Sequence, residues 1–359
     1  MAIDARDRVL LALQHREADR VPISDFPWST TEERWHREGL PAGVSAAEYF
    51  GFDLWGFWGD NSLQLEPRTV EEGADYTVTT GTDGQTVRNW KGRTSTPELV
   101  DFAITSRARW EEVKPSMRYN DRRLDWTAVR RGYEQARSRG LFVYLGFGPG
   151  FTKTCNMVGP ERCLLAMVED PEWVADMFLT DARLCAAIAE HVLAAGLDVD
   201  AGWLFDDLGF KHKGFFSPDL YRRLLLPAHR LVCDVFRRHG KPVLLHSCGY
   251  VTEFVPAFIE AGFACLQPLE VKAGNDLLGL KSRYGERLAL MGGIDARAMA
   301  DPDPAVIERE IATKVPAAMR GGGYLFHSDH SVPDNVSFAQ YCRVMELAQR
   351  YGRYGACRA

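Results

Sequence analysis

The chain has 359 residues, of which 46% are hydrophobic and 26% charged, and its formal net charge is −6. This composition is ordinary for a globular core, and the negative charge argues against nucleic acid or an anionic membrane surface as a partner, since both require a basic field. No window approaches the roughly 18 consecutive apolar residues of a membrane span, and the charged N-terminus lacks a signal peptide's apolar segment, so we expect a cytoplasmic chain with reduced cysteines.

Short apolar runs alternate with helical patterns along the chain. The predicted strands, in chain order, are residues 21–24, 53–58, 141–147, 199–205, 242–245, 264–269, 288–294 and 324–326. The predicted helices between and after the later strands are residues 217–238, 251–261, 275–284, 303–320 and 337–350. This alternation is typical of parallel strands in βαβ units, and eight such strands close a barrel.

We therefore predict one α/β domain over residues 1–359, a (β/α)8 TIM barrel. The alternative is a doubly wound open sheet, but no strand opens into a GxGxxG or P-loop turn. One insertion, at about residues 62–96, interrupts the pattern after the second strand. There Tyr76–Thr80 and Thr86–Trp90 alternate in polarity on either side of Asp83-Gly84, which predicts a β-hairpin.

Ionisable or polar residues follow nearly every predicted strand. They are Asp60, Asp206, Asp207, His246, Cys248, Glu270, Asp295, His327, Asp329 and His330. In a barrel the C-terminal ends of the strands meet on one face, where barrel active sites are built. The alternative for each aspartate is a helix cap, but histidine and cysteine are poor caps.

His246-Ser247-Cys248 is the sharpest local motif. Positions i and i+2 of a strand face the same side, so an imidazole and a thiol would point together into the barrel mouth, and both are ligands of Zn²⁺. The alternative is a hydrogen-bonded histidine beside a buried cysteine. A metal needs at least one more ligand, and the candidates follow the last strand (His327, Asp329, His330) and the fourth (Asp206, Asp207).

A second motif is Gly146-Phe147-Gly148-Pro149-Gly150. Its glycines permit close backbone approach to a ligand, in which case Phe147 would contact the substrate. The alternative is a flexible turn after the third strand.

Taken together, several segments resemble the uroporphyrinogen decarboxylase superfamily, which includes the decarboxylase and the corrinoid-dependent methyltransferases. The segments, which span nearly the whole chain, are residues 146–149, 204–207, 216–218, 226–227, 246–249, 291–295 and 322–324 with Pro333. The resemblance implies a single (β/α)8 barrel, in agreement with the strand count. Barrels of this type often form homodimers, which is the assembly we expect.

Three positions depart from what the resemblance implies for a true decarboxylase. The segment Ser24–Trp28 lacks the arginines that bind the porphyrinogen carboxylates, and arginine supplies bidentate carboxylate recognition. Asn156 stands where the decarboxylases have a tyrosine, and Asp329 where they have a histidine. Asp60 matches their pyrrole-binding aspartate.

The methyltransferase branch resembles this chain at the metal motif. Its zinc ligands are a His-x-Cys pair, matched by His246 and Cys248, and a later cysteine, where this chain has Asp329. Zn²⁺ accepts carboxylate oxygen, so the resemblance makes Asp329 the preferred third ligand.

The leading interpretation is a zinc-dependent methyltransferase that moves a methyl group between a small substrate and a corrinoid held by a separate partner. Asp206, Asp207 and Glu270 are the candidate acids and bases. The candidate substrate-binding residues are Asp60, Phe147, Asn156, Asp295, His327 and His330. The alternatives are a metal-free decarboxylase of the superfamily, and a non-catalytic barrel that binds a tetrapyrrole or docks a corrinoid protein.

Overall fold

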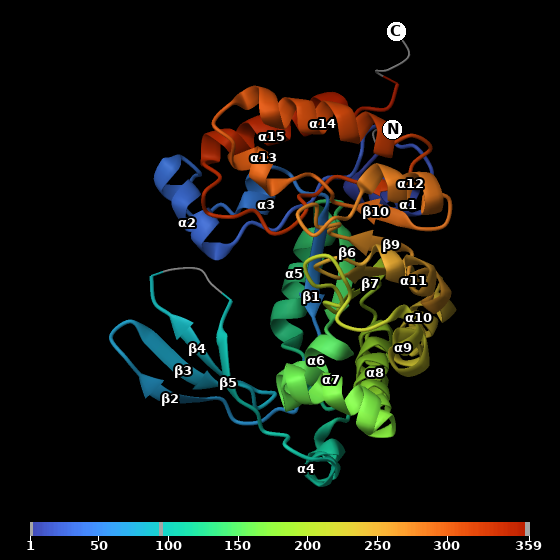
Figure 1. Ribbon diagram of the computed structural model, residues 1–359. Coiled ribbons are helices and arrows are strands. Elements are labelled where there is room, and N and C mark those ends of the chain that lie inside the picture. Colours follow the sequence, from blue (N-terminus) through green and yellow to red (C-terminus); the bar gives the residue numbers. More distant parts are fainter. Residues whose placement is uncertain (1–2, 93–95, 356–359) are drawn as a thin grey trace.

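The computed structural model of the chain describes residues 3–92 and 96–355 (Figure 1). Its central element is a curled sheet of seven parallel strands, each hydrogen-bonded to the next in chain order. The strands are β1 (Leu54–Trp58), β6 (Phe142–Phe147), β7 (Ala201–Phe205), β8 (Val243–His246), β9 (Cys265–Gln267), β10 (Ala289–Met291) and β11 (Tyr324–Leu325). All seven lie at predicted strand positions.

The predicted first strand, residues 21–24, forms only a single bridge, between Ile23 and Phe326. The Phe326 amide donates to the Pro22 carbonyl at 2.8 Å, and the Asp53 amide donates to the Ile23 carbonyl at 2.8 Å. This extended segment therefore lies between the last and the first strand of the sheet. The result is a TIM-barrel-like α/β fold with seven regular strands among the described residues, and not an open doubly wound sheet.

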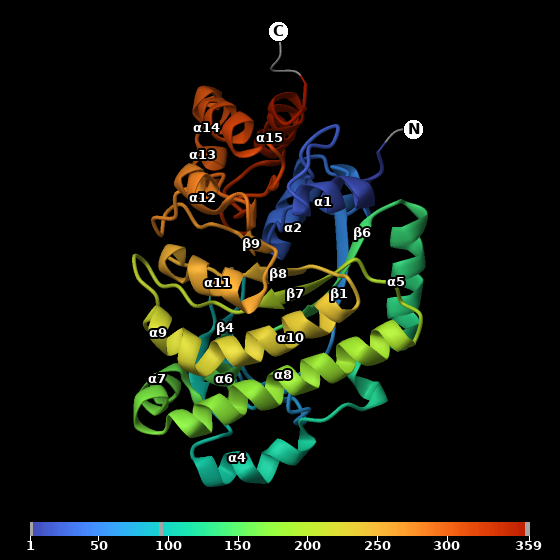
Figure 2. The ribbon, with the colours of Figure 1, turned by 90° about the vertical axis from the view of Figure 1, so that its right-hand side faces the viewer.

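Helices cover the outside of the sheet, and the long α8 lies against α10 (Figure 2). The helices are α1 (Ala5–Leu13), α2 (Ser29–Glu38), α3 (Ala46–Tyr49), α4 (Arg107–Val113), α5 (Trp126–Ser138), α6 (Phe151–Val158), α7 (Pro160–Glu169), α8 (Pro171–Ala194), α9 (Pro218–Leu220), α10 (Leu226–Arg238), α11 (Val255–Ala261), α12 (Leu277–Tyr284), α13 (Ala296–Ala300), α14 (Pro304–Ala318) and α15 (Phe338–Tyr351). None of them has the length and apolar character needed to cross a membrane.

The helix predicted over residues 217–238 begins where expected but is not regular. Ser217 caps it by accepting from the Leu220 amide at 3.1 Å. A π-helical segment, Tyr221–Leu225, then separates α9 from α10. Pro227 has no amide hydrogen to donate to the carbonyl four residues earlier, which is why regular α-helical bonding is not maintained at this point.

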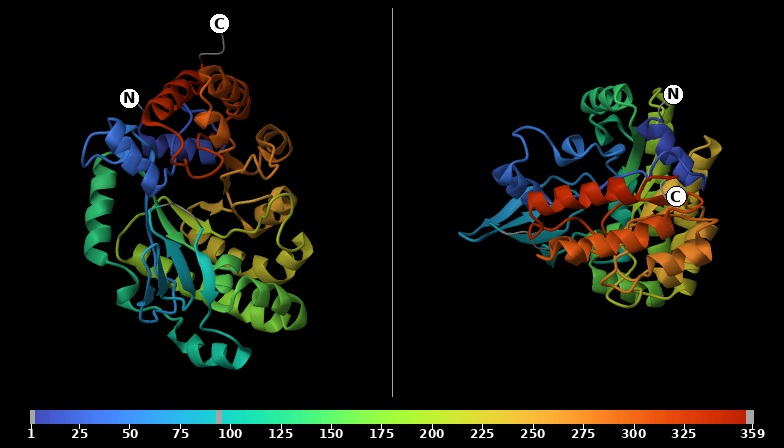
Figure 3. Two further views of the ribbon diagram at one scale, coloured as in Figure 1. Left: turned by 60° about the vertical axis from the view of Figure 1, so that its left-hand side comes forward. Right: turned by 90° about the horizontal axis from the view of Figure 1, so that it is seen from above.

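The insertion is larger than the hairpin predicted over residues 62–96. Four antiparallel strands form a second sheet: β2 (Arg68–Glu72), β3 (Tyr76–Thr80), β4 (Thr86–Trp90) and β5 (Glu98–Asp101). The sheet stands off from the body of the molecule (Figure 3). β3 and β4 lie where the hairpin strands were predicted, but every residue of β2 and β5 is exposed, so neither has the apolar alternation that marks a strand in sequence.

A buried polar cluster ties this insertion to the helices that cover the sheet. Asp83, in the turn between β3 and β4, pairs with Lys153 of α6 at 2.6 Å, and both side chains are buried. Asp181 of α8 is fully buried and accepts from the Asn61 amide group at 2.7 Å and from the Gly150 amide at 3.2 Å. Burial raises the pKa of Asp181 to about 7, although Lys153 and the Asn61 hydrogen bond oppose this rise.

This shift predicts a pH-dependent loss of stability. The pKa in the folded chain lies above the unfolded value of about 3.9, so between the two values the folded chain holds a proton that the unfolded chain has released. The contribution of Asp181 is therefore complete below about pH 4 and is lost as the pH rises towards about 7. In Asp181→Asn, the free energy of unfolding relative to wild type should rise by about 2–3 kcal/mol from about pH 5 to about pH 7. Urea unfolding of both proteins across this range checks the prediction, and a constant difference would contradict it.

Candidate functional site

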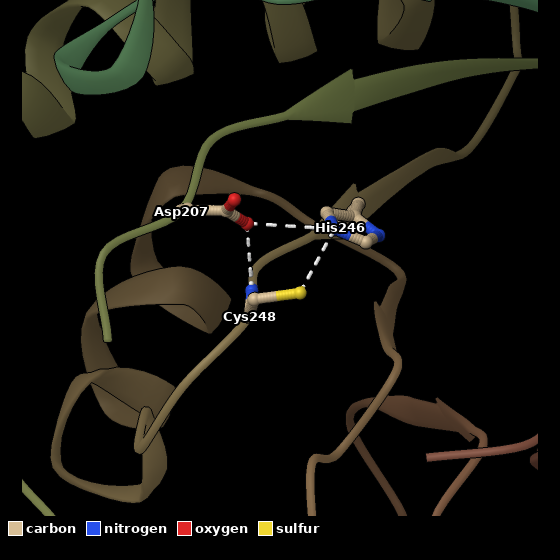
Figure 4. Close-up of side chains that lie close together, drawn as sticks. All are labelled: Asp207, His246 and Cys248. Atoms are coloured by element: carbon tan, nitrogen blue, oxygen red, sulfur yellow. Dashed lines mark hydrogen bonds and ion pairs between the residues drawn. The ribbon is translucent and has the colours of Figure 1, made fainter. Parts of the chain in front are cut away.

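Three potential metal ligands meet at the C-terminal ends of β7 and β8. Asp207 follows β7, His246 ends β8, and Cys248 lies two residues further on (Figure 4). His246 Nε2 is 3.4 Å from Cys248 Sγ and 3.4 Å from Asp207 Oδ1. Among residues 3–92 and 96–355 this is the one group of three histidine, cysteine or acidic side chains whose donor atoms all lie within 4.8 Å of one another.

Sheet register and loop contacts position these side chains. Phe205 of β7 pairs with His246 of β8, and their rings stack with centroids 4.5 Å apart. The Cys248 amide donates to Asp207 Oδ1 at 2.8 Å, which joins the loops after the two strands. The same loops touch at Gly209 and Gly249, where a Cβ on Gly249 would lie 2.2 Å from the Gly209 carbonyl carbon. Since Gly249 also has a φ of +77°, a side chain is excluded there by both space and backbone conformation.

The electrostatics of the group oppose a free thiolate and favour a carboxylate. Burial raises the pKa of Cys248 well above its usual value, and the negative charges of Asp207 and Glu270 add to this rise. Burial would also raise the pKa of Asp207, but the nearby His246 ring and the hydrogen bond from the Cys248 amide outweigh this effect and lower that pKa. The group thus combines a carboxylate with a neutral thiol.

Two of the three separations within the donor set suit a tetrahedral ion. Bonds of about 2.0–2.3 Å to nitrogen, oxygen and sulfur at tetrahedral angles place donor atoms about 3.3–3.6 Å apart. The two separations of 3.4 Å lie within that range. Nitrogen, oxygen and sulfur are all zinc ligands, and three protein ligands leave a fourth position for another molecule. The three residues could therefore hold a metal ion of the zinc type.

A cavity of about 500 Å³ opens beside this group. Its lining residues are Asp207, Gly209, Phe210, Lys211, His212, Phe215, Cys248, Gly249, Glu270, Lys272 and Ala273. Glu270 accepts from the Gly249 amide at 2.7 Å and pairs with Lys272 at 3.1 Å. A smaller cavity of about 210 Å³, which also contains Lys272, is lined by Trp28, Asp295, Asp329 and His330 among others.

Asp206 does not face the cavity, although it is adjacent to Asp207 in sequence. Its carboxylate is fully buried and accepts from the Phe151 amide at 3.0 Å and the Thr152 amide at 2.7 Å, at the start of α6. His229 Nε2 lies 3.2 Å away. A Cβ on Gly150 would lie 2.4 Å from Asp206 Oδ2, so the glycine motif admits this carboxylate. These contacts suit an anion at a helix N-terminus.

Asp329 is separate from the three-residue group. Its Oδ2 accepts from the Val271 amide at 2.8 Å and its Oδ1 from the Ala296 amide at 2.9 Å. Asp207 provides the carboxylate near His246 and Cys248 instead. The predicted role of Asp329 as third metal ligand thus has no geometric support, and Asp207, which was predicted as an acid or base, takes its place in the group.

The predicted substrate-binding residues lie in different surroundings. Asp295 and His330 line the smaller cavity. Phe147 and His327 are fully buried, and Asn156 lies in α6. Asp60 follows β1 and accepts from the Ser62 amide at 2.8 Å and the Gln64 side chain at 3.0 Å. Of this set, only Asp295 and His330 line either of the two cavities described above.

Two features of the site were not predicted. Gln267 is buried at the end of β9, and its side-chain amide contacts the rings of His246 and His327. Lys211 and His212, in the loop after β7, line the larger cavity. Gln267 could have been noticed in the sequence as a polar residue within an otherwise apolar predicted strand. The loop that contains Lys211 and His212 has no sequence pattern that predicts its position at the cavity.

Known proteins share this fold and part of the sequence. A methyltransferase from Methanosarcina mazei superposes with a TM-score of 0.69 at 15% identity, over 97% of this chain and 99% of that one, which shows a common fold. A uroporphyrinogen decarboxylase from Streptomyces griseus subsp. griseus is 29% identical over 213 residues, or 55% of this chain and 53% of the relative, so the match spans about half of the relative's length. The family model for uroporphyrinogen decarboxylase (URO-D) matches residues 75–351. Because this match extends over well over half of the sequence, the chain belongs to the uroporphyrinogen decarboxylase (URO-D) family.

Proposed function

We propose that the chain is a zinc-dependent methyltransferase that moves a methyl group between a small substrate and a corrinoid carried by a separate partner. The observation that carries the proposal is the Asp207–His246–Cys248 group beside a cavity of about 500 Å³. Similarity in fold to the Methanosarcina methyltransferase supports the proposed reaction class.

Each residue of the site has a distinct part in this proposal. Asp207, His246 and Cys248 would hold the ion. When bound, zinc would act as a Lewis acid that lowers the pKa of a substrate thiol or polarises an ether oxygen. Phe210 and Phe215 would contact the apolar part of the substrate. The ammonium groups of Lys211 and Lys272, which also line the cavity, would attract an anionic group.

Glu270 lies at the cavity wall, where it could act as a general base. It lines the cavity with its carboxylate 3.1 Å from Lys272 and bonded to the Gly249 amide. A carboxylate in this position can accept the proton that a substrate thiol releases. In a transfer to a thiol, the corrinoid would supply the methyl group, and Glu270 would take up the proton that the thiol loses.

A methyl-transfer assay tests the function. Zinc-loaded protein is incubated with methylcobalamin and a panel of small thiols, or with reduced cobalamin and methyl ethers, and the cobalamin absorption is followed. We expect transfer in one direction, with a rate that falls by roughly 100-fold or more in His246→Ala, since general acid, base or Lewis-acid contributions have at least this size. Rates in His246→Ala equal to wild type, or no transfer with either pairing, would overturn the proposal.

Decarboxylation of uroporphyrinogen is the second candidate, favoured by the 29% identical relative. The segment Ser24–Trp28 argues against it. Ser24 and Asp25 are buried, Trp28 lines the smaller cavity, and none of the five residues can pair with a carboxylate as arginine does. We therefore expect no coproporphyrinogen when the protein is incubated with uroporphyrinogen. Its formation at an enzymatic rate, measured by chromatography, would favour the decarboxylase instead.

A further inference from the structure

We propose that Gln267 and His327 are positioning residues that fix the tautomer of His246, so that its Nε2 presents a lone pair towards Asp207 and Cys248. The inference rests on the proposed function in one respect, namely that the lone pair would bind the metal ion. It concerns a buried hydrogen-bonded chain that runs from β8 through β9 to the residues that follow β11.

The chain of contacts is continuous and buried. His246 Nδ1 lies 2.5 Å from Gln267 Oε1, and Gln267 Nε2 lies 3.2 Å from His327 Nε2. His327 Nδ1 lies 2.6 Å from the carbonyl oxygen of Ser328. Gln267 and His327 are 1% and 0% exposed, so water cannot substitute for either partner. Each contact therefore has to be satisfied within the protein.

The far end of the chain is anchored by Asp25. Its carboxylate lies 3.5 Å from His327 Nδ1 and accepts from the Ser328 hydroxyl at 2.5 Å and from the Tyr341 hydroxyl at 2.9 Å. The ring of Phe26 packs edge-on against His327, with centroids 5.2 Å apart. The His327 ring is thus held in place by contacts on both its polar and its apolar sides.

The chemistry of the donors and acceptors fixes the direction of each hydrogen bond between Ser328 and His246. The Ser328 carbonyl can only accept, so His327 Nδ1 carries a proton and donates it. Burial lowers the pKa of His327, against the opposing effect of Asp25, so the ring is neutral and its Nε2 accepts. Gln267 must then turn its amide nitrogen to His327 and its oxygen to His246. That oxygen can only accept, so His246 Nδ1 carries a proton and donates it, and in the neutral imidazole the lone pair then lies on Nε2.

The free lone pair faces the other two donor atoms. His246 Nε2 is the atom that lies 3.4 Å from both Cys248 Sγ and Asp207 Oδ1. Metal-binding histidines commonly donate their other ring N–H to such a partner, and loss of that partner lowers metal affinity about 10- to 100-fold. Without Gln267 the neutral imidazole would populate both tautomers, and one of them places a hydrogen where the ion would bind.

Three variants separate this role from a merely structural one. Gln267→Leu removes both contacts, whereas Gln267→Glu keeps an acceptor for His246 but loses the donor to His327. Asn61→Leu is the matched control, because it removes another buried amide that bonds to Asp181. Two properties are measured on each: the affinity for Co²⁺ by competition with a chelator, and the protonation of the His246 ring nitrogens in metal-free protein by ¹⁵N NMR.

We expect wild-type His246 to be protonated on Nδ1 alone. Gln267→Leu should give mixed tautomers and bind Co²⁺ about 10- to 100-fold more weakly, while Gln267→Glu and Asn61→Leu should keep the wild-type tautomer of His246 and stay within a few-fold of its affinity. Equal losses in the Glu and Leu variants, or wild-type His246 protonated on Nε2, would overturn the inference.

The two measurements also distinguish this inference from the proposed function. The wild-type NMR result decides the tautomer even when no variant folds. If wild type binds no Co²⁺ but shows the expected tautomer, the positioning of His246 stands and the metal-dependent function fails. If wild type binds Co²⁺ and Gln267→Leu changes neither the tautomer nor the affinity, the proposed metal site stands and the positioning inference fails.

Discussion

Replacing Asp207 with alanine should remove tight metal binding and leave the fold intact. Asp207 supplies the oxygen nearest to His246 Nε2, at 3.4 Å, and it lines the cavity instead of the core. Loss of a ligand should cost at least as much as loss of a ligand's hydrogen-bond partner, so we expect Zn²⁺ affinity to fall by roughly 100-fold or more. The free energy of unfolding should fall by only about 1 kcal/mol, the value of the hydrogen bond from the Cys248 amide.

Competition with a chromophoric chelator gives the affinity, and urea unfolding of the metal-free protein gives the stability. Asp329→Ala provides the comparison, because Asp329 was the predicted third ligand and instead binds the Val271 and Ala296 amides. We expect this variant to keep its Zn²⁺ affinity to within a few-fold if it folds. Loss of Zn²⁺ in Asp329→Ala together with retention in Asp207→Ala would return the third ligand to Asp329.

Asp206→Ala should have the opposite effect, a large loss of stability. Three donors converge on this buried carboxylate: the Phe151 and Thr152 amides, at 3.0 and 2.7 Å, and His229 Nε2, at 3.2 Å. Removal of the acceptor leaves these donors unpaired in the interior and takes away the anion at the N-terminus of α6. We expect a loss of about 3–5 kcal/mol in the free energy of unfolding, since each buried donor left without an acceptor costs about 1–3 kcal/mol.

Urea unfolding of Asp206→Ala beside Asp207→Ala makes the test, because the two variants delete the same group one residue apart. The expected result is a large shift in the midpoint for Asp206→Ala and a small one for Asp207→Ala. A loss of less than about 1 kcal/mol in Asp206→Ala, together with loss of activity, would indicate a catalytic role for Asp206 instead of a structural one.

The strand positions and the mouth of the sheet could be predicted from local pattern. A buried parallel strand is a short apolar run, and a polar residue at its end marks the edge where sites form. His246 and Cys248 were predicted to lie together because alternate residues of a strand share a side. Residues 21–24 were located correctly, although they form a single bridge and not a regular strand.

Contacts between strands could not be predicted in the same way. The register that pairs Phe205 with His246 brings Asp207 next to Cys248, and nothing in the spacing of these residues along the chain specifies it. Asp206 and Asp207 look equivalent in sequence, yet one faces α6 and the other the cavity. Gln267 carries no charge and belongs to no motif, so its contact with two histidines emerges only from the assembled sheet.

The zinc content of the protein tests the central claim most directly. Protein purified without a histidine tag is loaded with Zn²⁺, dialysed and analysed for metal, and X-ray absorption at the zinc edge identifies the ligands. We predict about one zinc per chain, with one sulfur at about 2.3 Å and nitrogen or oxygen at about 2.0–2.2 Å, and loss of the metal in a folded Cys248→Ser variant. Wild-type protein that retains no zinc, or a zinc content unchanged in Cys248→Ser, would contradict the proposed metal centre.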